Sequence, residues 1–114
     1  MRAELISPPG SIPDVPGGTM YFLVEAETAL PATMTAAERA ELDDREGQAG
    51  TRLVETGKLV HIWRVPGRRA NVAIWSCDDA DDLHRSLTSL PAWPWMDITV
   101  RPLATHPLSH LLSR

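Results

Sequence analysis

The order along the chain of segments with helix-like and strand-like repeats of apolar residues constrains its fold more than any other feature. Two segments repeat apolar residues every three or four positions, as amphipathic helices do; they are residues 36–56 and roughly 78–90. Four segments alternate, or are rich in β-branched and aromatic residues, as strands are; they are residues 20–28, 59–65, 70–77 and 97–101. The turn-forming residues Pro-Gly-Arg-Arg at 66–69 would join the middle two strands as a hairpin.

Local signals indicate where the two helices begin and end. Thr35 followed by Glu38 has the spacing of a capping box, and Gly57 suits the end of the first helix. Asp78 or Asp79 can cap the second helix. The pattern therefore predicts an α+β domain of the ferredoxin-like βαββαβ type, in which two helices cover one face of a four-stranded antiparallel sheet.

The length of 114 residues fits one domain, because two cores of half that size would be too small. Residues 1–19 are rich in Pro and Gly, which interrupt helices and sheets, and we interpret them as an N-terminal extension. This extension is either a loose tail or an arm that docks on a neighbouring subunit. The domain itself is predicted to span residues 20–104, and residues 105–114 form a C-terminal tail that is a candidate interface arm.

Composition and charge exclude several classes of protein. The net charge is -4 and the basic residues are scattered among acids, which argues against nucleic acid as a partner. No segment approaches the roughly 20 apolar residues of a membrane span, and the N-terminus lacks the apolar core of a signal peptide. The single cysteine, Cys77, excludes an internal disulfide and a cysteine-based zinc site, so we expect a cytoplasmic protein.

Strand alternation predicts two unlike faces of the sheet. The apolar set is expected under the helices and comprises Phe22, Val24, Val60, Ile62, Val72, Ile74, Ile98 and Val100. The opposite set mixes aromatic, acidic, imidazole and amide groups and comprises Glu25, His61, Trp63, Asn71, Trp75, Asp97 and Thr99. Such a mixture is typical of a ligand pocket. The alternative is a plain interface between subunits.

Several short motifs in register resemble one known family. They are His-Ile-Trp-Arg at 61–64, Gly67 with Ala70-Asn71, Leu-Pro-Ala-Trp-Pro-Trp-Met-Asp-Ile at 90–98, and Thr-His-Pro-Leu-Ser at 105–109. Over about ninety residues the chain resembles the muconolactone isomerase family. The resemblance implies a subunit that pairs sheet to sheet and assembles into oligomers from dimer to decamer. It also implies cofactor-free isomerisation of a small unsaturated lactone in aromatic catabolism.

Moving a double bond in a butenolide ring requires a base, a hydrogen-bond donor for the dienolate oxygen, and return of the proton to another carbon. Glu25 and His61 are the candidate bases, and Asn71 is the candidate donor. The candidate substrate-binding residues are Arg64 or Arg69 for a carboxylate, Trp63 and Trp75 as apolar walls, and His84. The alternatives are that His61 and His84 are structural and that Arg64 pairs with Glu46 or another acid.

No metal site is expected, because the aspartates near residue 80 suit the start of a helix. Several residues nevertheless depart from the family's usual pattern. Asp43 stands where Lys is usual, Arg69 where Tyr is usual, and Trp75-Ser76 where Phe-Asp is usual. A different or larger aromatic substrate, processed by a cyclase or cofactor-free monooxygenase, is one alternative function, and a non-catalytic oligomeric binding protein is another.

Overall fold

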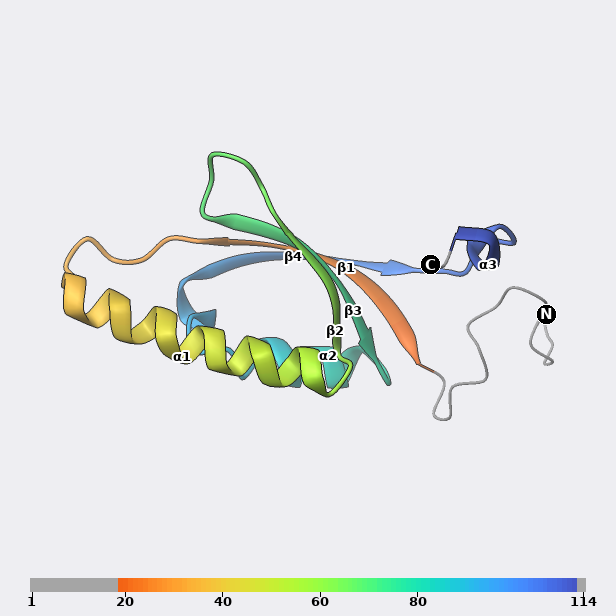
Figure 1. The fold of residues 1–114 in the computed structure, drawn as a ribbon, viewed down its shortest axis with the longest axis horizontal. Helices are drawn as coiled ribbons and strands as arrows, with labels where there is room; N and C mark the ends of the chain where they lie inside the picture. The colour runs from red at the N-terminus through yellow and green to blue at the C-terminus, as the bar shows by residue number, and fades with distance from the viewer. Residues whose placement is uncertain (1–18, 113–114) are drawn as a thin grey trace.

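The computed structural model describes residues 19–112 as a sheet layer packed against a helix layer (Figure 1). Its elements are β1 Met20–Thr28, α1 Ala36–Glu55, β2 Leu59–Arg64, β3 Ala70–Cys77, α2 Ala80–Thr88, the 3-10 turn η1 Trp93–Trp95, β4 Met96–Leu103 and α3 Ser109–Leu112. The predicted order βαββαβ is confirmed. The proposed extension at residues 1–19 lies almost wholly outside the described residues.

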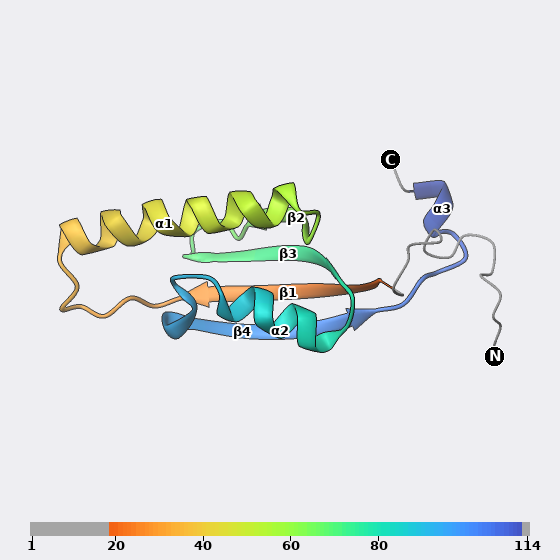
Figure 2. The same ribbon diagram turned by 90° about the horizontal axis from the view of Figure 1, so that it is seen from below.

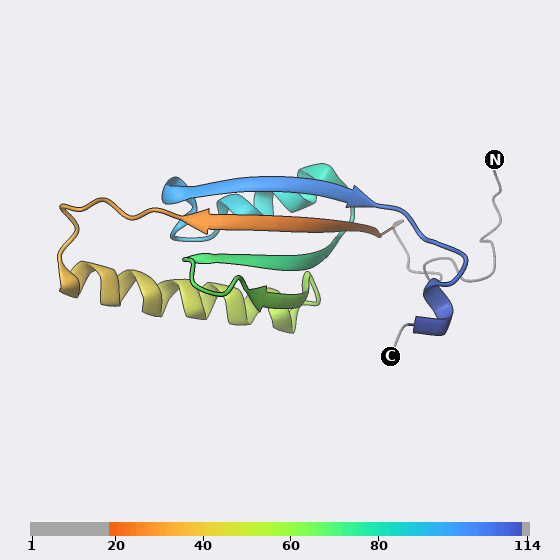
Figure 3. The same ribbon diagram turned by 90° about the horizontal axis from the view of Figure 1, so that it is seen from above.

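The sheet has the strand order β2-β3-β1-β4, and every neighbouring pair is antiparallel. Figure 2 shows α1 on the β2 side and α2 on the β4 side of the same face, whereas Figure 3 shows the opposite face free of helices. We call this helix-free side the open face. The architecture is ferredoxin-like, as the sequence predicts. Within residues 19–112 no helix is long and apolar enough to cross a membrane.

Capping determines the helix starts that the sequence predicts. The Thr35 amide donates to Glu38 Oε1 at 2.8 Å and the Glu38 amide donates to Thr35 Oγ1 at 3.1 Å, so the capping box forms. Asp79 caps α2 by accepting from the Asp82 amide at 2.8 Å. Gly57 follows α1 with φ of 81°, in the left-handed region that glycine adopts at low cost. The observed α2 ends at Thr88, two residues earlier than predicted, and β4 is longer at both ends.

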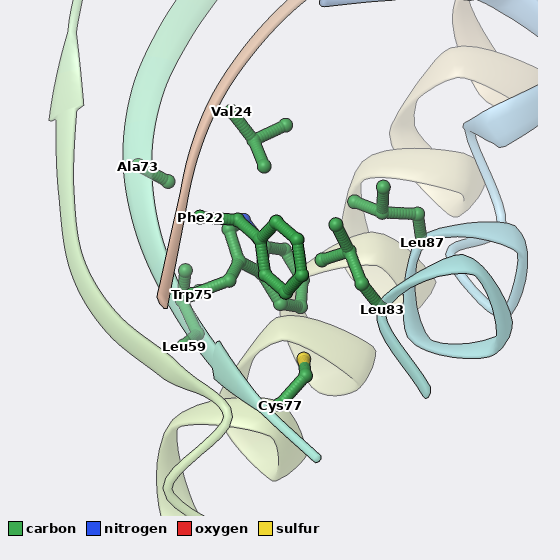
Figure 4. Close-up of a cluster of buried hydrophobic side chains, with 8 residues drawn as sticks. All are labelled: Phe22, Val24, Leu59, Ala73, Trp75, Cys77, Leu83 and Leu87. Carbon is green, nitrogen blue, oxygen red and sulfur yellow. The ribbon is translucent and has the colours of Figure 1, made fainter. Parts of the chain in front are cut away.

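The hydrophobic core lies between the sheet and the two helices (Figure 4). Phe22 and Trp75 lie against each other at its centre, and Leu83 and Leu87 of α2 cover them. Val24, from the central strand β1, is only 1% exposed. The other buried members of the cluster are Leu59, Ala73 and Cys77.

The prediction that Trp75 and Asn71 lie on the open face is wrong. Trp75 pairs with Phe22 and is 4% exposed in the core, and Asn71 pairs with Ala26 on the helix-covered side. The predicted positions of Val72 and Ile74 are consequently also wrong, because these side chains lie on the open face. The cause is that β3 carries large apolar residues in both phases, so alternation cannot select its buried face.

A bulge in β2 explains another difference from the predicted core. Leu59 pairs with Trp75 but His61 pairs with Ile74, so the strand gains one residue between them. Val60 is the extra residue and is 42% exposed instead of buried. Ile62 has the predicted facing, opposite Ala73, yet it is 52% exposed because β2 is an edge strand. Val100, also predicted in the core, is 41% exposed near the opposite edge.

A buried carboxylate fastens the start of α2 to the beginning of β2. Asp82 is 7% exposed, and its Oδ2 accepts from Lys58 Nζ at 2.8 Å and from the Asp78 amide at 2.9 Å. Arg85 lies near the second oxygen, at 3.8 Å. These bonds hold the pKa of Asp82 below its ordinary value, with the hydrogen bond from Lys58 as the largest cause. The carboxylate therefore contributes to stability while it is ionised.

Candidate functional site

Five of the seven predicted pocket residues do share the open face. Side chains there form rows across the sheet, because residues paired between strands point the same way. One row is Trp63, Val72, Glu25 and Thr99, and the next is His61, Ile74, Leu23 and Arg101. Asp97 lies one row further along, opposite Glu27. Glu25 and Trp63 are thus two strands, roughly 10 Å, apart.

A shallow cleft of about 200 Å³ opens on this face where β1 ends, and we call it the sheet cleft. Its lining contains the exposed carboxylates of Glu25 and Glu27 together with Asp97. Arg68 of the hairpin turn forms an ion pair with Glu27. The remaining lining residues are Ala26, Val65, Ala70, Asn71 and Thr99. Glu25 is therefore a carboxylate that could accept a proton from a small molecule in this cleft.

A larger cleft of about 450 Å³ lies between α1 and the β2–β3 hairpin, and we call it the hairpin cleft. Its lining residues are Thr28, Asp43, Ile62, Trp63, Arg64, Arg69, Ala70 and Asn71. Arg69 lies 3.6 Å from Asp43 of α1, and both side chains are more than half exposed. Arg64 is exposed and forms no ion pair or side-chain hydrogen bond with the described residues. A guanidinium in this position can bind a carboxylate with two parallel hydrogen bonds.

The two clefts share lining residues at the start of β3. Ala70 and Asn71 line both of them, although Asn71 has the opposite facing from Glu25 in the sheet register. Asn71 can do so because it is the second residue of β3, beside the hairpin turn. Glu25 thus lines the sheet cleft, Arg64 and Arg69 line the hairpin cleft, and Asn71 lines both.

Of the other predicted site residues, Trp63 lines the hairpin cleft, whereas His61, His84 and Trp75 line neither cleft. His61 stacks on Trp63, with ring centroids 5.5 Å apart and planes at 21°, and it lines neither cleft. His84 is exposed on α2, on the far side of the sheet from Glu25. Trp75 is in the core and cannot form a pocket wall. Within residues 19–112, no group of three or more histidine, cysteine or acidic side chains could hold a metal ion.

Glu46 does not form the ion pair with Arg64 that the sequence offered as an alternative. Its Oε1 accepts from the Ala92 amide at 2.9 Å and so fastens α1 to the loop before η1. Partial burial raises the pKa of Glu46, and the negative charge of Asp43 adds to this effect, although the bond from Ala92 opposes it. Glu46 therefore has a structural role, because its carboxylate holds the loop at Ala92 against α1.

Sequence reasoning missed Thr28, Glu27 and Arg68 as cleft residues. All three lie beside the hairpin turn or at the end of β1, where the pairing of β1 with β3 brings them together. The available signal was the turn itself: a register anchored at residues 66–69 would have placed Arg68 close to the end of β1.

Comparison with known proteins agrees with this fold. Residues 20–109 match the family model described as muconolactone delta-isomerase. The muconolactone delta-isomerase of Cupriavidus pinatubonensis is 39% identical over 90 residues, which cover 79% of this chain and 98% of that protein. Muconolactone delta-isomerase 2 of Acinetobacter lwoffii is 37% identical over 87 residues, covering 76% and 91%.

The chain belongs to the muconolactone delta-isomerase family. A crystal structure of muconolactone isomerase superimposes with a TM-score of 0.73 at 35% identity, covering 77% of this chain and 92% of that one. Asp43 and Arg69, which the sequence analysis singled out as differing from the residues usual in the family it resembles, lie 3.6 Å apart. These two residues form one ion pair in the lining of the hairpin cleft.

Proposed function

We propose that this protein is a cofactor-free isomerase that shifts a double bond in a small unsaturated lactone, as muconolactone is converted to the enol-lactone of 3-oxoadipate. Membership of the family supports the reaction class. The observation that supports the proposal for this chain is that Asn71 lines both a cleft that contains the Glu25 carboxylate and a cleft that contains the Arg64 guanidinium. A lactone with a carboxylate side chain needs both kinds of group at once.

In the proposed mechanism Glu25 acts as the base. Its carboxylate removes an acidic ring proton, and the electron pair moves into the ring to give a dienolate whose oxygen accepts a hydrogen bond from the Asn71 amide. The protonated Glu25 then returns the same proton to another ring carbon, so no redox partner is needed. Arg64 holds the side-chain carboxylate of the substrate and orients the ring. Among the two predicted bases Glu25 is favoured over His61, because only Glu25 lines a cleft with Asn71.

We further propose that the protein works as a homo-oligomer in which the open face meets a second copy. Leu23, Val72 and Ile74 lie on that face, and Trp63 is 57% exposed. Covering these apolar groups would remove water from the sheet cleft and strengthen the hydrogen bonds within it. The C-terminal tail, with Leu108, Leu111 and Leu112 exposed, is a candidate contact for a neighbouring subunit, as the sequence predicted.

The test is an ultraviolet assay of the purified protein with muconolactone, comparing wild type, Glu25→Gln and Glu27→Gln. Glu27 is the matched control, because it lines the same cleft on the same strand and face. We expect Glu25→Gln to reduce kcat by about 10²-fold or more, and Glu27→Gln to reduce it less than about 10-fold. Size-exclusion chromatography verifies that each variant assembles like wild type.

Two results would contradict the proposal in different ways. Equal losses in the two variants would remove Glu25 as the base, and His61→Ala would then become the decisive variant. Wild type that binds muconolactone without turning it over would instead favour the non-catalytic binding protein.

A further inference from the structure

The charges around the hairpin cleft do not cancel. Three ionised side chains line it, namely Asp43, Arg64 and Arg69. Arg69 is paired with Asp43 at 3.6 Å, whereas Arg64 has no such partner among residues 19–112. The cleft therefore carries one net positive charge, and one guanidinium is available for an anion.

Neighbouring acidic side chains do not change the net charge of the hairpin cleft. Glu46, on the same helix as Asp43, directs its carboxylate to the Ala92 amide. Glu27 is paired with Arg68 on the sheet-cleft side of the hairpin. Glu25 lines the sheet cleft and not the hairpin cleft. Asp43 is thus the acid that decides the charge of the hairpin cleft.

Resting on the function proposed above, we propose that Asp43 is a specificity-determining residue that restricts the site to substrates with one carboxylate. Asp43 forms an ion pair with Arg69, so that only Arg64 is available to bind the substrate's carboxylate. The negative charge of Asp43 would also repel a second carboxylate on the substrate. A closed lactone acid has one carboxylate, and hydrolysis of its ring creates another. The Asp43–Arg69 pair would therefore admit the closed ring and disfavour the open dicarboxylate of the same carbon skeleton.

The test compares binding of two saturated six-carbon probes by isothermal titration calorimetry at low salt. Tetrahydrofuran-2-acetate carries one carboxylate and adipate carries two, and neither can undergo the proton shift. The proteins are wild type, Asp43→Asn, and Asp44→Asn as the matched control, because Asp44 is the next residue of α1 and lines neither cleft. Both substitutions change the net charge equally.

We expect Asp43→Asn to raise the affinity for adipate about 5-fold, the size of one unit charge acting across an exposed site. The affinity for tetrahydrofuran-2-acetate should change by less than about 2-fold, because that carboxylate binds at Arg64 and is partly screened from residue 43. Asp44→Asn should leave the ratio of the two affinities at its wild-type value. Arg64→Gln should weaken the one-carboxylate probe by about 10-fold, whereas Arg52→Gln, on the exposed far end of α1, should not.

Any of three results would overturn this inference. The first is that Asp43→Asn and Asp44→Asn have the same ratio of affinities for adipate and tetrahydrofuran-2-acetate. The second is that Arg64→Gln binds tetrahydrofuran-2-acetate as tightly as wild type does, and the third is that wild type does not measurably bind this probe. The outcome is separable from that of the proposed function, because the probes report charge selectivity without turnover. If the protein does not turn over muconolactone but discriminates between the two probes as expected, only the isomerase function is refuted. If it turns over muconolactone but does not discriminate between the probes, only the role of Asp43 is refuted.

Discussion

Removing the carboxylate of Asp82 should cost a large part of the stability of this domain. Asp82→Ala deletes the acceptor for Lys58 Nζ and for the Asp78 amide, bonds of 2.8 Å and 2.9 Å. It leaves a partly buried backbone amide without a partner and an ammonium without its counter-ion. Hydrogen bonds to charged groups contribute about 1.5–3 kcal/mol each, and breaking a buried ion pair costs about 3–5 kcal/mol. Because the Lys58 side chain is 32% exposed and stays partly hydrated, we expect a combined loss of about 2–4 kcal/mol.

The assay is urea unfolding followed by tryptophan fluorescence at one protein concentration, since assembly would make stability depend on concentration. A loss of this size should lower Tm by about 10–25 °C for a domain of this length. Asp82→Asn keeps an oxygen that can accept from the Asp78 amide but loses the charge, so we expect it to lower the free energy of unfolding by about 1–2 kcal/mol. Asp81→Asn is the matched control, because Asp81 is exposed in the same turn and should change stability by less than about 0.5 kcal/mol.

The dependence on pH tests the cause of the effect. Because the pKa of Asp82 is lowered in the folded state, its carboxylate stabilises the fold fully above the unfolded value of about 3.9. That contribution is lost as pH falls from there through the folded pKa. The difference in the free energy of unfolding between wild type and Asp82→Asn should therefore be constant from pH 7 to about pH 5 and shrink progressively as pH falls below about 3.9. A difference below about 0.5 kcal/mol at pH 7, or one that persists undiminished at low pH, would refute this reasoning.

Three further predictions follow from the fold. Glu46→Gln should keep an oxygen that accepts from the Ala92 amide. Because the pKa of Glu46 is raised, its ionised form destabilises the fold at neutral pH, so this variant should be neutral or slightly stabilising in urea unfolding above pH 6. Glu46→Ala removes the acceptor and should lower the free energy of unfolding by about 1 kcal/mol. Gly57→Ala should cost about 1 kcal/mol, because φ of 81° strains any side chain, and a neutral result would contradict the left-handed end of α1. Trp75→Ala should lower the free energy of unfolding by about 3–5 kcal/mol, more than Trp63→Ala does, because Trp75 is buried in the core; a loss below about 0.5 kcal/mol would restore the open-face position that the sequence predicted for Trp75.

Local chemistry made the helices and the hairpin predictable, whereas the facing of the strands depended on tertiary packing. Thr35 with Glu38 and Asp79 act within a few residues of themselves, so their roles could be inferred from the sequence alone. In β3 both phases are apolar, and only the pairing of Trp75 with Phe22 selects the buried one. The bulge after Leu59 likewise depends on β3, because a lone strand has no register.

The candidate site was predictable in part, for the same reason. Glu25 has the predicted facing because β1 alternates cleanly, and Arg64 and Arg69 lie in the cleft because they flank a recognisable turn. Asp43 could be identified only as a departure from the family pattern. Its contact with Arg69 arises from the packing of α1 beside the hairpin, which no local pattern specifies.

The division of the candidate site between two structural pieces bears on how the protein could change over evolution. Trp63, Arg64, Arg69 and Asn71 all belong to the β2–β3 hairpin, whose tip extends beyond the core, whereas Glu25 is on the central strand β1 (Figure 1). Substitutions or insertions at the hairpin tip would alter which molecule is held without disturbing the strand that carries the proton-transfer group. Substrate choice and chemical capability could thus diverge independently, and an exchanged hairpin should bring a new binding preference to an intact catalytic strand.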